Sequence, residues 1–234
     1  MYEDVFNRTL SKKLTNAKKR EAKLDAELLA IKKRALELDD ARQDMALSVK
    51  DIMASLAKVF PLDLKDPNFK DTPNRVARAW IEMFSGLGVK DKDVLGTFFP
   101  SGKYNQIILL KDIEYVSMCS HHFMPFTGMA HVGYIPNTSK NNVCGLSKLA
   151  RLVDKYAIQP QLQERMCQQI MQALKKHIKP SGAMVILEGK HSCLGCRGIK
   201  KSRSKMITSA VDGDFHEPGT KQEFLKLVGL DSAD

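Results

Sequence analysis

The chain has 234 residues and a formal net charge of +10, and 43% of its residues are hydrophobic, enough for one large domain with an appendage. Its apolar runs, such as residues 107–110, are too short for a transmembrane helix, and its charged first twenty residues do not resemble a signal peptide. Five cysteines, an odd number, then predict reduced thiols and a cytoplasmic protein.

Residues 1–46 are predicted to form a domain of their own, a long charged helix. The stretch between Glu3 and Leu47 contains no Pro or Gly, and its apolar residues repeat every seven positions, the spacing of a coiled coil. One series comprises Leu10, Ala17, Leu24, Ile31, Leu38 and Met45, and a second, interleaved series comprises Leu14, Leu28 and Ala35. Glu21 and Arg42 interrupt the second series. Two interpretations stay open: a single helix lying on the body of the protein, and self-association as a coiled coil, with another protein as a possible helical partner.

Residues 47–234 are predicted to form a second domain that mixes helices and strands. Helices are expected at residues 47–60, ended by Pro61, and at residues 72–84, with Thr72 as a cap and Pro73 in the first turn. Two strands are expected at residues 104–117 and 128–135, then a helical segment at residues 145–178 broken near Pro160, then strands at residues 183–187 and 205–211. This order predicts an α+β fold with a mostly antiparallel sheet.

Two short clusters carry most of the chemistry, Cys119-Ser-His121-His122 and His191-Ser-Cys193. Thiols and imidazoles bind zinc tetrahedrally, and three protein ligands leave the fourth position to water, as in a catalytic site. Adjacent histidines at a strand end point to opposite sides, so only one of the pair is expected to join Cys119. The spacing of His191 and Cys193 puts both on one face of an extended segment. Two histidines remain as acid–base groups, which predicts a hydrolytic metalloenzyme.

The other cysteines have different interpretations. Cys193 and Cys196 have the Cys-x-x-Cys spacing, so a structural zinc knuckle or a redox pair stays open, although no second pair follows at the usual spacing. Cys144 and Cys167 lie among apolar residues in the sequence and are predicted to be ordinary core cysteines.

A basic segment, residues 139–205, contains fourteen Lys or Arg and three acidic residues. It is consistent with a solvated face, a nucleic-acid surface or a pocket for a polyanionic small molecule. Its only aromatic residue is Tyr156, and base stacking normally needs more, which argues against nucleic acid. Within the segment Ser147, Lys148 and Arg151 open a predicted helix, whose free N–H groups and dipole favour a phosphate group.

Several motifs together resemble the GTP cyclohydrolase I family, in that family's order. They are Met118-Cys-Ser-His-His, Ala130-His-Val-Gly-Tyr-Ile-Pro, Gly145-Leu-Ser-Lys-Leu-Ala-Arg151, Gln161-Leu-Gln-Glu-Arg165 and His191-Ser-Cys-Leu-Gly-Cys-Arg-Gly198, with Asp71-Thr-Pro-Asn-Arg75, Ser85-Gly86-Leu87 and Gln222-Glu-Phe-Leu225 towards the two ends. The resemblance covers residues 47–230 and does not extend to the first 46. It implies the tunnelling fold, in which antiparallel sheets from several subunits join into a barrel, and a decamer whose active sites are shared between subunits.

The resemblance also implies a role for each matching residue. The implied ligands of Zn2+ are Cys119, His122 and Cys193, and the implied acid–base residues are His121 and His191. The implied guanine contacts are Gln163 and Glu164, although a helical Gln-Glu pair taken alone is more often plain surface. The implied triphosphate contacts are Ser147, Lys148, Arg151 and Arg197, with Arg75 and Arg78 lent by a neighbouring subunit. The implied reaction converts GTP and water to formate and 7,8-dihydroneopterin triphosphate, the first step of pterin, folate or deazaguanine synthesis.

The chain departs from the family pattern in three places. Ser120 stands where the family commonly has Glu, Cys196 adds a thiol near the predicted metal, and the heptad-bearing N-terminus replaces a short leader. None of these changes a predicted ligand. Two rival interpretations stay open: a related tunnelling-fold enzyme such as a nitrile reductase, which would use a cysteine nucleophile, and a catalytically degenerate paralogue that acts as a scaffold through its N-terminal helix.

Overall fold

The computed structural model describes the backbone of residues 2–96, 98–100, 102–139 and 143–230, and their side chains from residue 15 onward except residue 17. The chain divides into two compact units, residues 1–81 and residues 82–234. A membrane-spanning helix would need a long apolar stretch, and none of the described helices has one.

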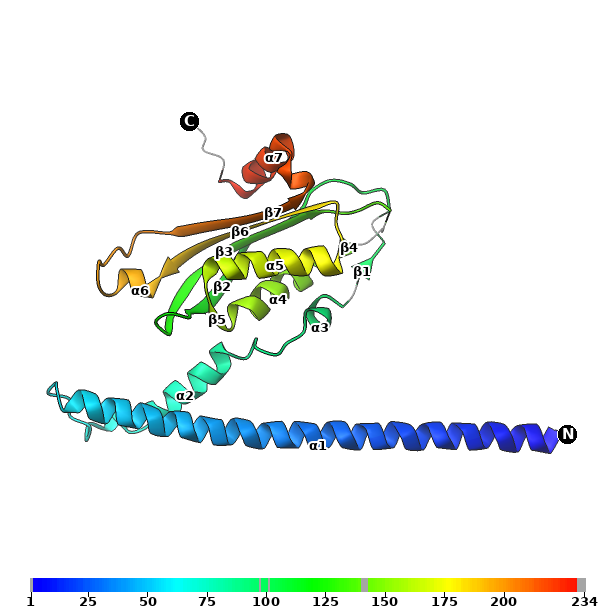
Figure 1. Ribbon diagram of the computed structural model, residues 1–234, viewed down its shortest axis with the longest axis horizontal. Coiled ribbons are helices and arrows are strands. Elements are labelled where there is room, and N and C mark those ends of the chain that lie inside the picture. The colour runs from blue at the N-terminus through cyan, green and yellow to red at the C-terminus, as the bar shows by residue number, and fades with distance from the viewer. Residues whose placement is uncertain (1, 97, 101, 140–142, 231–234) are drawn as a thin grey trace. The chain divides into compact units, whose positions relative to one another are not determined.

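The first unit is built on a single helix, α1 (Tyr2–Ala57), which is 56 residues long (Figure 1). The sequence predicted two helices that meet near residue 47, and this prediction was wrong. No Pro or Gly occurs before Pro61, so nothing in the backbone interrupts the helix at the predicted boundary. The side chains of Leu10, Leu14 and Ala17, which begin the predicted heptads, lie outside the described residues.

A short 3-10 helix, η1 (Pro67–Phe69), precedes α2 (Thr72–Met83), which agrees with the predicted helix to within one residue. Thr72 does not cap it. It is the first helical residue, and its hydroxyl donates to the Asn68 carbonyl oxygen (3.5 Å). The polar contacts at this helix start come from Asp71 instead, whose carboxylate accepts hydrogen bonds from the side chains of Asn74 (3.0 Å) and Arg78 (3.1 Å).

The second unit has the predicted α+β composition and a mostly antiparallel sheet. The five-stranded sheet has the order β5-β2-β3-β6-β7, in which only β2 and β5 run parallel. Its strands are β2 (Ile108–Cys119), β3 (Met124–Ile135), β5 (Pro160–Gln161), β6 (Gly182–His191) and β7 (Met206–Gly213). The short strands β1 (Phe98–Phe99) and β4 (Val143–Cys144) pair separately.

The helices of the second unit are α3 (Asp91–Leu95), α4 (Leu146–Ala157), α5 (Gln163–His177), α6 (Ser192–Gly195) and α7 (Pro218–Val228), with the 3-10 helix η2 (Asp214–His216) before α7. The predicted break near Pro160 is confirmed, because β5 begins there and separates α4 from α5. The fixed φ angle of proline and its missing N–H disfavour a continuous helix at this point.

Alternation along β6 shows how both faces of the sheet are buried. Ala183, Val185 and Leu187 belong to the core beneath α4 and α5, whereas Met184 and Ile186 point to the opposite face and pack with residues of η2 and α7. Figure 1 shows α4 and α5 on one side of the sheet and α7 on the other. β6 is therefore buried on both faces over most of its length and ends at His191.

An ion-pair cluster joins α3 to α4. The Asp91 carboxylate accepts hydrogen bonds from Lys155 Nζ (2.6 Å) and Tyr156 OH (2.7 Å), and His177 Nε2 lies 3.7 Å away. Burial alone would raise the pKa of Asp91, but these partners hold it below its usual value. A lowered carboxyl pKa contributes stability above the unfolded-state pKa of about 3.9, and this contribution is lost as pH falls through the folded-state pKa.

We therefore expect Asp91→Asn to lower the free energy of unfolding at pH 7 by about 1–3 kcal/mol. The difference between parent and variant should shrink as the pH falls below about 4, because the parent carboxylate then also becomes neutral. Denaturant unfolding at pH 7 and pH 3 measures both quantities. Asp93→Asn is the control, since Asp93 is exposed on the same helix. An equal loss of stability in both variants would contradict the assignment to the cluster.

Candidate metal centre and active site

The sheet topology brings the two cysteine–histidine clusters together. Strands β2 and β6 both pair antiparallel with β3, so they run in the same direction and end at the same end of the sheet. Cys119 is the last residue of β2, and Cys193 lies in α6, directly after β6. Their Sγ atoms are 3.9 Å apart although 74 residues separate them in sequence.

His122 completes the cluster from the turn between β2 and β3. Its Nδ1 lies 3.7 Å from Cys119 Sγ. The turn closes by a hydrogen bond from the Phe123 amide to the Cys119 carbonyl (2.9 Å), and Phe123 adopts a left-handed φ of 51°. The ligand atoms of Cys119, His122 and Cys193 all lie within 4.8 Å of one another, so the three residues could hold a metal ion.

The local conformation around Cys193 differs from the prediction. His191 and Cys193 were expected on one face of an extended segment, but only His191 is extended, and α6 begins at Ser192. The helical turn, rather than strand alternation, directs Cys193 toward Cys119. Cys196 follows α6, is exposed and does not belong to the cluster of potential ligands. Cys144 and Cys167 are buried, as predicted.

His191 is held on two sides. Its ring stacks on Phe126, with centroids 4.3 Å apart and an interplanar angle of 7°. Its Nε2 lies 3.0 Å from Gln163 Oε1. Burial lowers the pKa of His191, and the Glu164 carboxylate acts in the opposite direction. His191 is therefore neutral at pH 7 and sits within the electrostatic reach of Glu164. The second predicted acid–base residue, His121, is exposed, with its ring centroid 6.2 Å from that of His122.

Gln163 has a role that the sequence did not reveal. Its side chain is 1% exposed, and its amide nitrogen donates to the carbonyl oxygens of Leu187 (3.0 Å) and Met206 (2.9 Å). Carbonyl oxygens only accept, so these contacts orient the amide and turn its oxygen toward His191. Nε2 of His191 must then be the donor, which leaves Nδ1 as the basic nitrogen of the neutral ring. A Cβ at position 189 would collide with the Gln163 side chain, which explains why this residue is a glycine.

The predicted phosphate contacts are not gathered around the metal centre. Ser147, Lys148 and Arg151 lie in the first half of α4, whose 12 residues span about 18 Å. The chain beyond the far end of α4 pairs with the end of β2, where Gln161 lies opposite Cys119. Figure 1 accordingly shows β4 and the start of α4 at one end of the sheet and β5 and α6 at the other.

The predicted arginines have different positions. Arg197 is exposed, and its charge acts on Cys193, where it opposes the increase in pKa that burial and Cys119 cause. Arg75 and Arg78 belong to the first unit and both contact the Asp71 carboxylate, at 3.4 Å and 3.1 Å. Arg197 thus acts electrostatically on one residue of the candidate metal centre.

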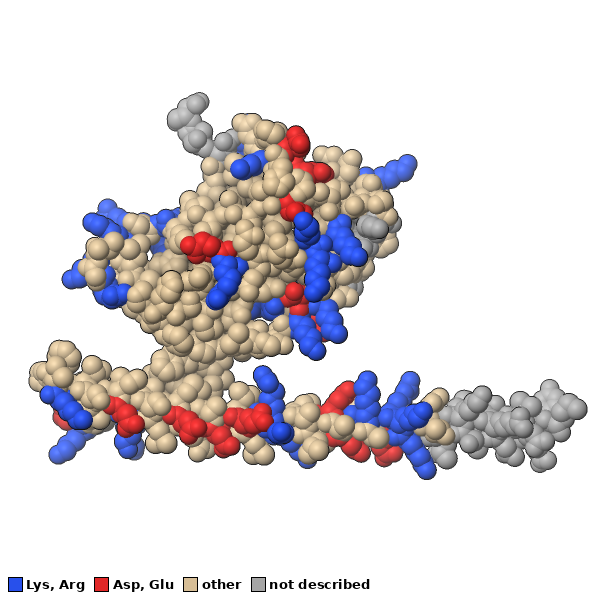
Figure 2. All heavy atoms as spheres, in the orientation of Figure 1, with Lys and Arg blue, Asp and Glu red and all other residues tan. Residues whose placement is uncertain are grey.

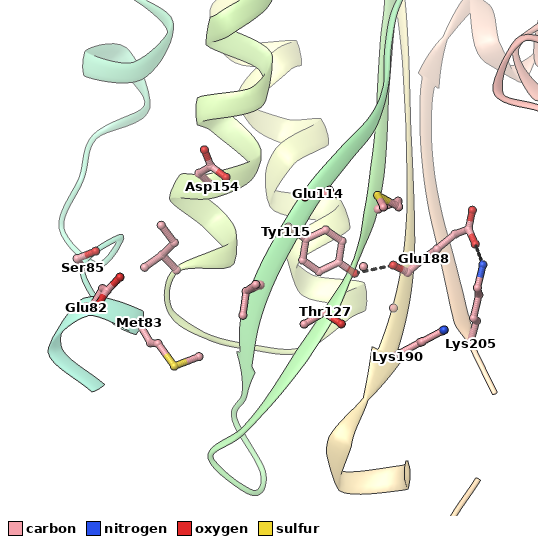
Figure 3. A pocket seen from close by; sticks show the side chains of 15 residues that line it. Glu82, Met83, Ser85, Glu114, Tyr115, Thr127, Asp154, Glu188, Lys190 and Lys205 are labelled. Carbon is pink, nitrogen blue, oxygen red and sulfur yellow. Dashed lines mark hydrogen bonds and ion pairs between the residues drawn. The ribbon is translucent and has the colours of Figure 1, made fainter. Parts of the chain in front are cut away.

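A cavity of about 930 Å³ lies elsewhere in the second unit. Figure 3 shows its wall on the strands, where Tyr115 donates to the Glu188 carbonyl (3.1 Å) and Lys205 pairs with the Glu188 carboxylate (3.0 Å). Glu82, near the end of α2, and Ser85, just after that helix, line the opposite side. None of the predicted metal, acid–base or substrate residues lines this cavity. The cavity and the metal centre are therefore separate features.

Fold and site together define an α+β protein with a two-cysteine, one-histidine candidate metal centre and further imidazoles beside it. The chain belongs to the GTP cyclohydrolase I family, whose model matches residues 47–229. The first 46 residues lie outside that match.

Similar proteins agree with this membership. GTP cyclohydrolase 1 of Streptomyces avermitilis is 43% identical over 192 residues, which cover 82% of this chain and 92% of the relative. GTP cyclohydrolase 1 of Streptomyces griseus subsp. griseus is 47% identical over 167 residues, or 70% of this chain and 82% of the relative. The protein of the same name from Dehalococcoides mccartyi strain CBDB1 is 42% identical over 187 residues, or 80% and 96%.

Proposed function

We propose that this chain is a zinc-dependent GTP cyclohydrolase, which converts GTP and water to formate and 7,8-dihydroneopterin triphosphate. The observation that carries the proposal is the convergence of Cys119, His122 and Cys193, with His191 held beside them, in a chain of the GTP cyclohydrolase I family. Family membership supports GTP as the substrate, and the cysteine–histidine cluster supports metal-assisted hydrolysis.

The distances in the cluster support zinc as the metal. Two sulfurs bound to zinc at about 2.3 Å in a tetrahedral site lie about 3.8 Å apart, and a sulfur and a nitrogen about 3.6 Å. The corresponding distances here are 3.9 Å between the two Sγ atoms and 3.7 Å between Cys119 Sγ and His122 Nδ1. Two thiols and an imidazole also suit zinc chemically. A zinc ion bound by three residues supplies a Lewis acid that activates water for attack on an electrophilic carbon.

The two remaining histidines would move protons. Hydrolytic opening of the purine requires proton transfer to the nitrogens of the five-membered ring and away from the attacking water. A neutral His191 that donates from Nε2 to Gln163 can accept a proton at Nδ1 and pass it on. The stack on Phe126 and the hydrogen bond to Gln163 would keep the imidazole in one orientation through this exchange.

The separation of the candidate metal and phosphate residues along α4 supports an active site shared between subunits. A head-to-tail association of subunits would bring the phosphate end of one chain to the metal end of the next. The sheet has the open edges that such an association needs. Among the described residues β7 pairs only with β6, and the first ten residues of β2 pair only with β3. We propose that these edges join neighbouring sheets into the barrel of a decamer.

The decisive experiment is to incubate the purified, zinc-loaded protein with GTP and to measure formate and pterin absorbance. GTP should yield both in equal amounts.

Lys148→Ala should raise KM for GTP in a salt-dependent way, because it removes a cation from the triphosphate site. Glu164→Ala should lower affinity for the base by about 1–3 kcal/mol. Equal turnover of GTP and guanosine by the parent would contradict the phosphate assignment, and no formate from either would contradict the function.

Gln163 provides a separate prediction about positioning. Gln163→Leu should reduce kcat by about 10–100-fold with little change in KM, because His191 loses the acceptor that orients it. The guanine contact predicted for Gln163 from the sequence implies instead a higher KM, so steady-state kinetics separate the two roles. Thr208→Val is the matched control, since Thr208 Oγ1 contacts the same amide nitrogen (3.2 Å) without touching His191. A variant with raised KM and unchanged kcat would contradict the positioning role.

A further inference from the structure

Helix α1 presents an apolar seam to solvent. Every described side chain between residues 15 and 41 is exposed, including Leu24 (64%), Leu28 (50%), Ile31 (66%) and Leu38 (45%). These residues follow the heptad spacing on a helix with no internal break. A continuous apolar seam on a long helix is typical of a surface that another helix covers.

The free part of the seam ends where the first unit begins to cover it. Met45 and Ala46 are half-buried, and Val49 is 6% exposed. A partner helix can therefore contact this seam on residues up to about 41. This segment lies outside the part of the chain that matches the family, so the family's catalytic domain does not account for it.

We propose that residues 18–41 of α1 pair with the same residues of a second copy in an antiparallel coiled coil, with a two-fold axis between residues 29 and 30. In this register Leu28 faces the partner's Ile31, and Leu24 faces the partner's Ala35, so a large residue meets a small one. Glu21 faces the partner's Leu38, at the end of the seam, where its carboxylate reaches water. The interface is isologous and closes on itself.

The charges that flank the seam support this register. Blue and red groups are interspersed along the described part of α1 in Figure 2. On one flank Asp25 faces the partner's Lys32, and on the other Glu27 faces the partner's Arg34. Both contacts occur twice, because the pair is symmetric. Opposite charges at flanking positions select the partner and the direction of a coiled coil.

Other arrangements bring like charges together. If the two-fold axis moved toward the N-terminus by one heptad of register, Asp25 would face the partner's Asp25, and Glu27 would face the partner's Glu27. If the axis moved by the same amount toward the C-terminus, Lys32 would face the partner's Lys32, and Arg34 would face the partner's Arg34. In a parallel pair in register, the flanking charges of the two helices would still attract each other. Glu21 would however lie against the partner's Glu21 inside the seam. The antiparallel register centred between residues 29 and 30 avoids all of these repulsions.

The test is hydrogen exchange of the full-length protein, read by mass spectrometry on peptides from residues 18–41. An exposed lone helix exchanges fast, whereas a paired one is protected. Leu28→Gln should speed exchange there on the order of tenfold or more. Leu29→Gln should not, because Leu29 is equally exposed (68%) but lies off the seam. Peptides from β6 should be unchanged in both variants, which checks the fold of the second unit.

A charge swap then identifies the partner and its direction. Glu27→Arg alone should lose protection, and the double change Glu27→Arg with Arg34→Glu should regain it, because opposite charges meet again across the antiparallel axis. In a parallel pair the double change would instead place like charges opposite Lys32 and Asp39. Fast exchange in the parent, equal effects of Leu28→Gln and Leu29→Gln, or a double variant as unprotected as the single one would each overturn the proposal.

Discussion

Replacing Cys193 with Ser is expected to abolish bound zinc and GTP turnover together. Cys193 Sγ is one of three ligand atoms, and a serine hydroxyl is a far poorer ligand than a thiolate for a metal that prefers sulfur and nitrogen. Two remaining ligands from one turn cannot define a tetrahedral site. Metal content by elemental analysis and formate release from GTP, measured on the same preparation, test both parts of this prediction.

Cys196→Ser is the matched control for that variant. Cys196 lies three residues further on, at the end of the same helical turn, but is exposed and outside the ligand cluster. It should retain one zinc per chain and full turnover. Loss of zinc in Cys196→Ser with retention in Cys193→Ser would show that the Cys-x-x-Cys interpretation of this segment is the correct one and that the ligand assignment is wrong.

The sequence revealed the ligand types of the metal centre but not how the backbone presents them. The two clusters could be proposed as metal ligands because thiols and imidazoles at short spacing are uncommon and chemically specific. The choice of Cys119, His122 and Cys193 within them rested on the resemblance to the GTP cyclohydrolase I family. The conformation around Cys193 was predicted from strand alternation, yet the strand stops at His191 and a helical turn follows. Where a strand ends depends on its neighbours in the sheet, and these are distant in sequence.

Long-range contacts also explain why the hydrogen bonds of the Gln163 side chain could not be predicted from the sequence. Its amide is oriented by carbonyl oxygens of Leu187 and Met206, which lie on two different strands. No local pattern distinguishes such a glutamine from a surface residue of the same helix. For helix α4 the sequence predicted the start to within one residue. Its distance from the candidate metal centre could not be predicted, because it depends on the pairing of β5 with the end of β2, a contact between segments distant in sequence.

His191→Ala is expected to reduce the rate of GTP turnover by about 10²–10⁴-fold while zinc stays near one equivalent per chain. The imidazole stacks on Phe126 and contacts Gln163, and it is not among the three ligand residues. Its removal therefore takes away a proton-transfer group without opening the metal centre. Zinc content and single-turnover kinetics on the same sample separate the loss of chemistry from a loss of metal.

The pair His121 and His122 supplies the comparison that makes this prediction specific. His122→Ala should lose the metal, because its Nδ1 lies 3.7 Å from Cys119 Sγ in the ligand cluster. His121→Ala should behave like His191→Ala, with metal retained and the rate reduced by orders of magnitude. Adjacent residues in one turn would then have opposite phenotypes, which a general disturbance of the turn would not produce. If His121→Ala lost zinc and His122→Ala kept it, the two imidazoles would have exchanged roles, and the proposed proton-transfer residue would have to be His122.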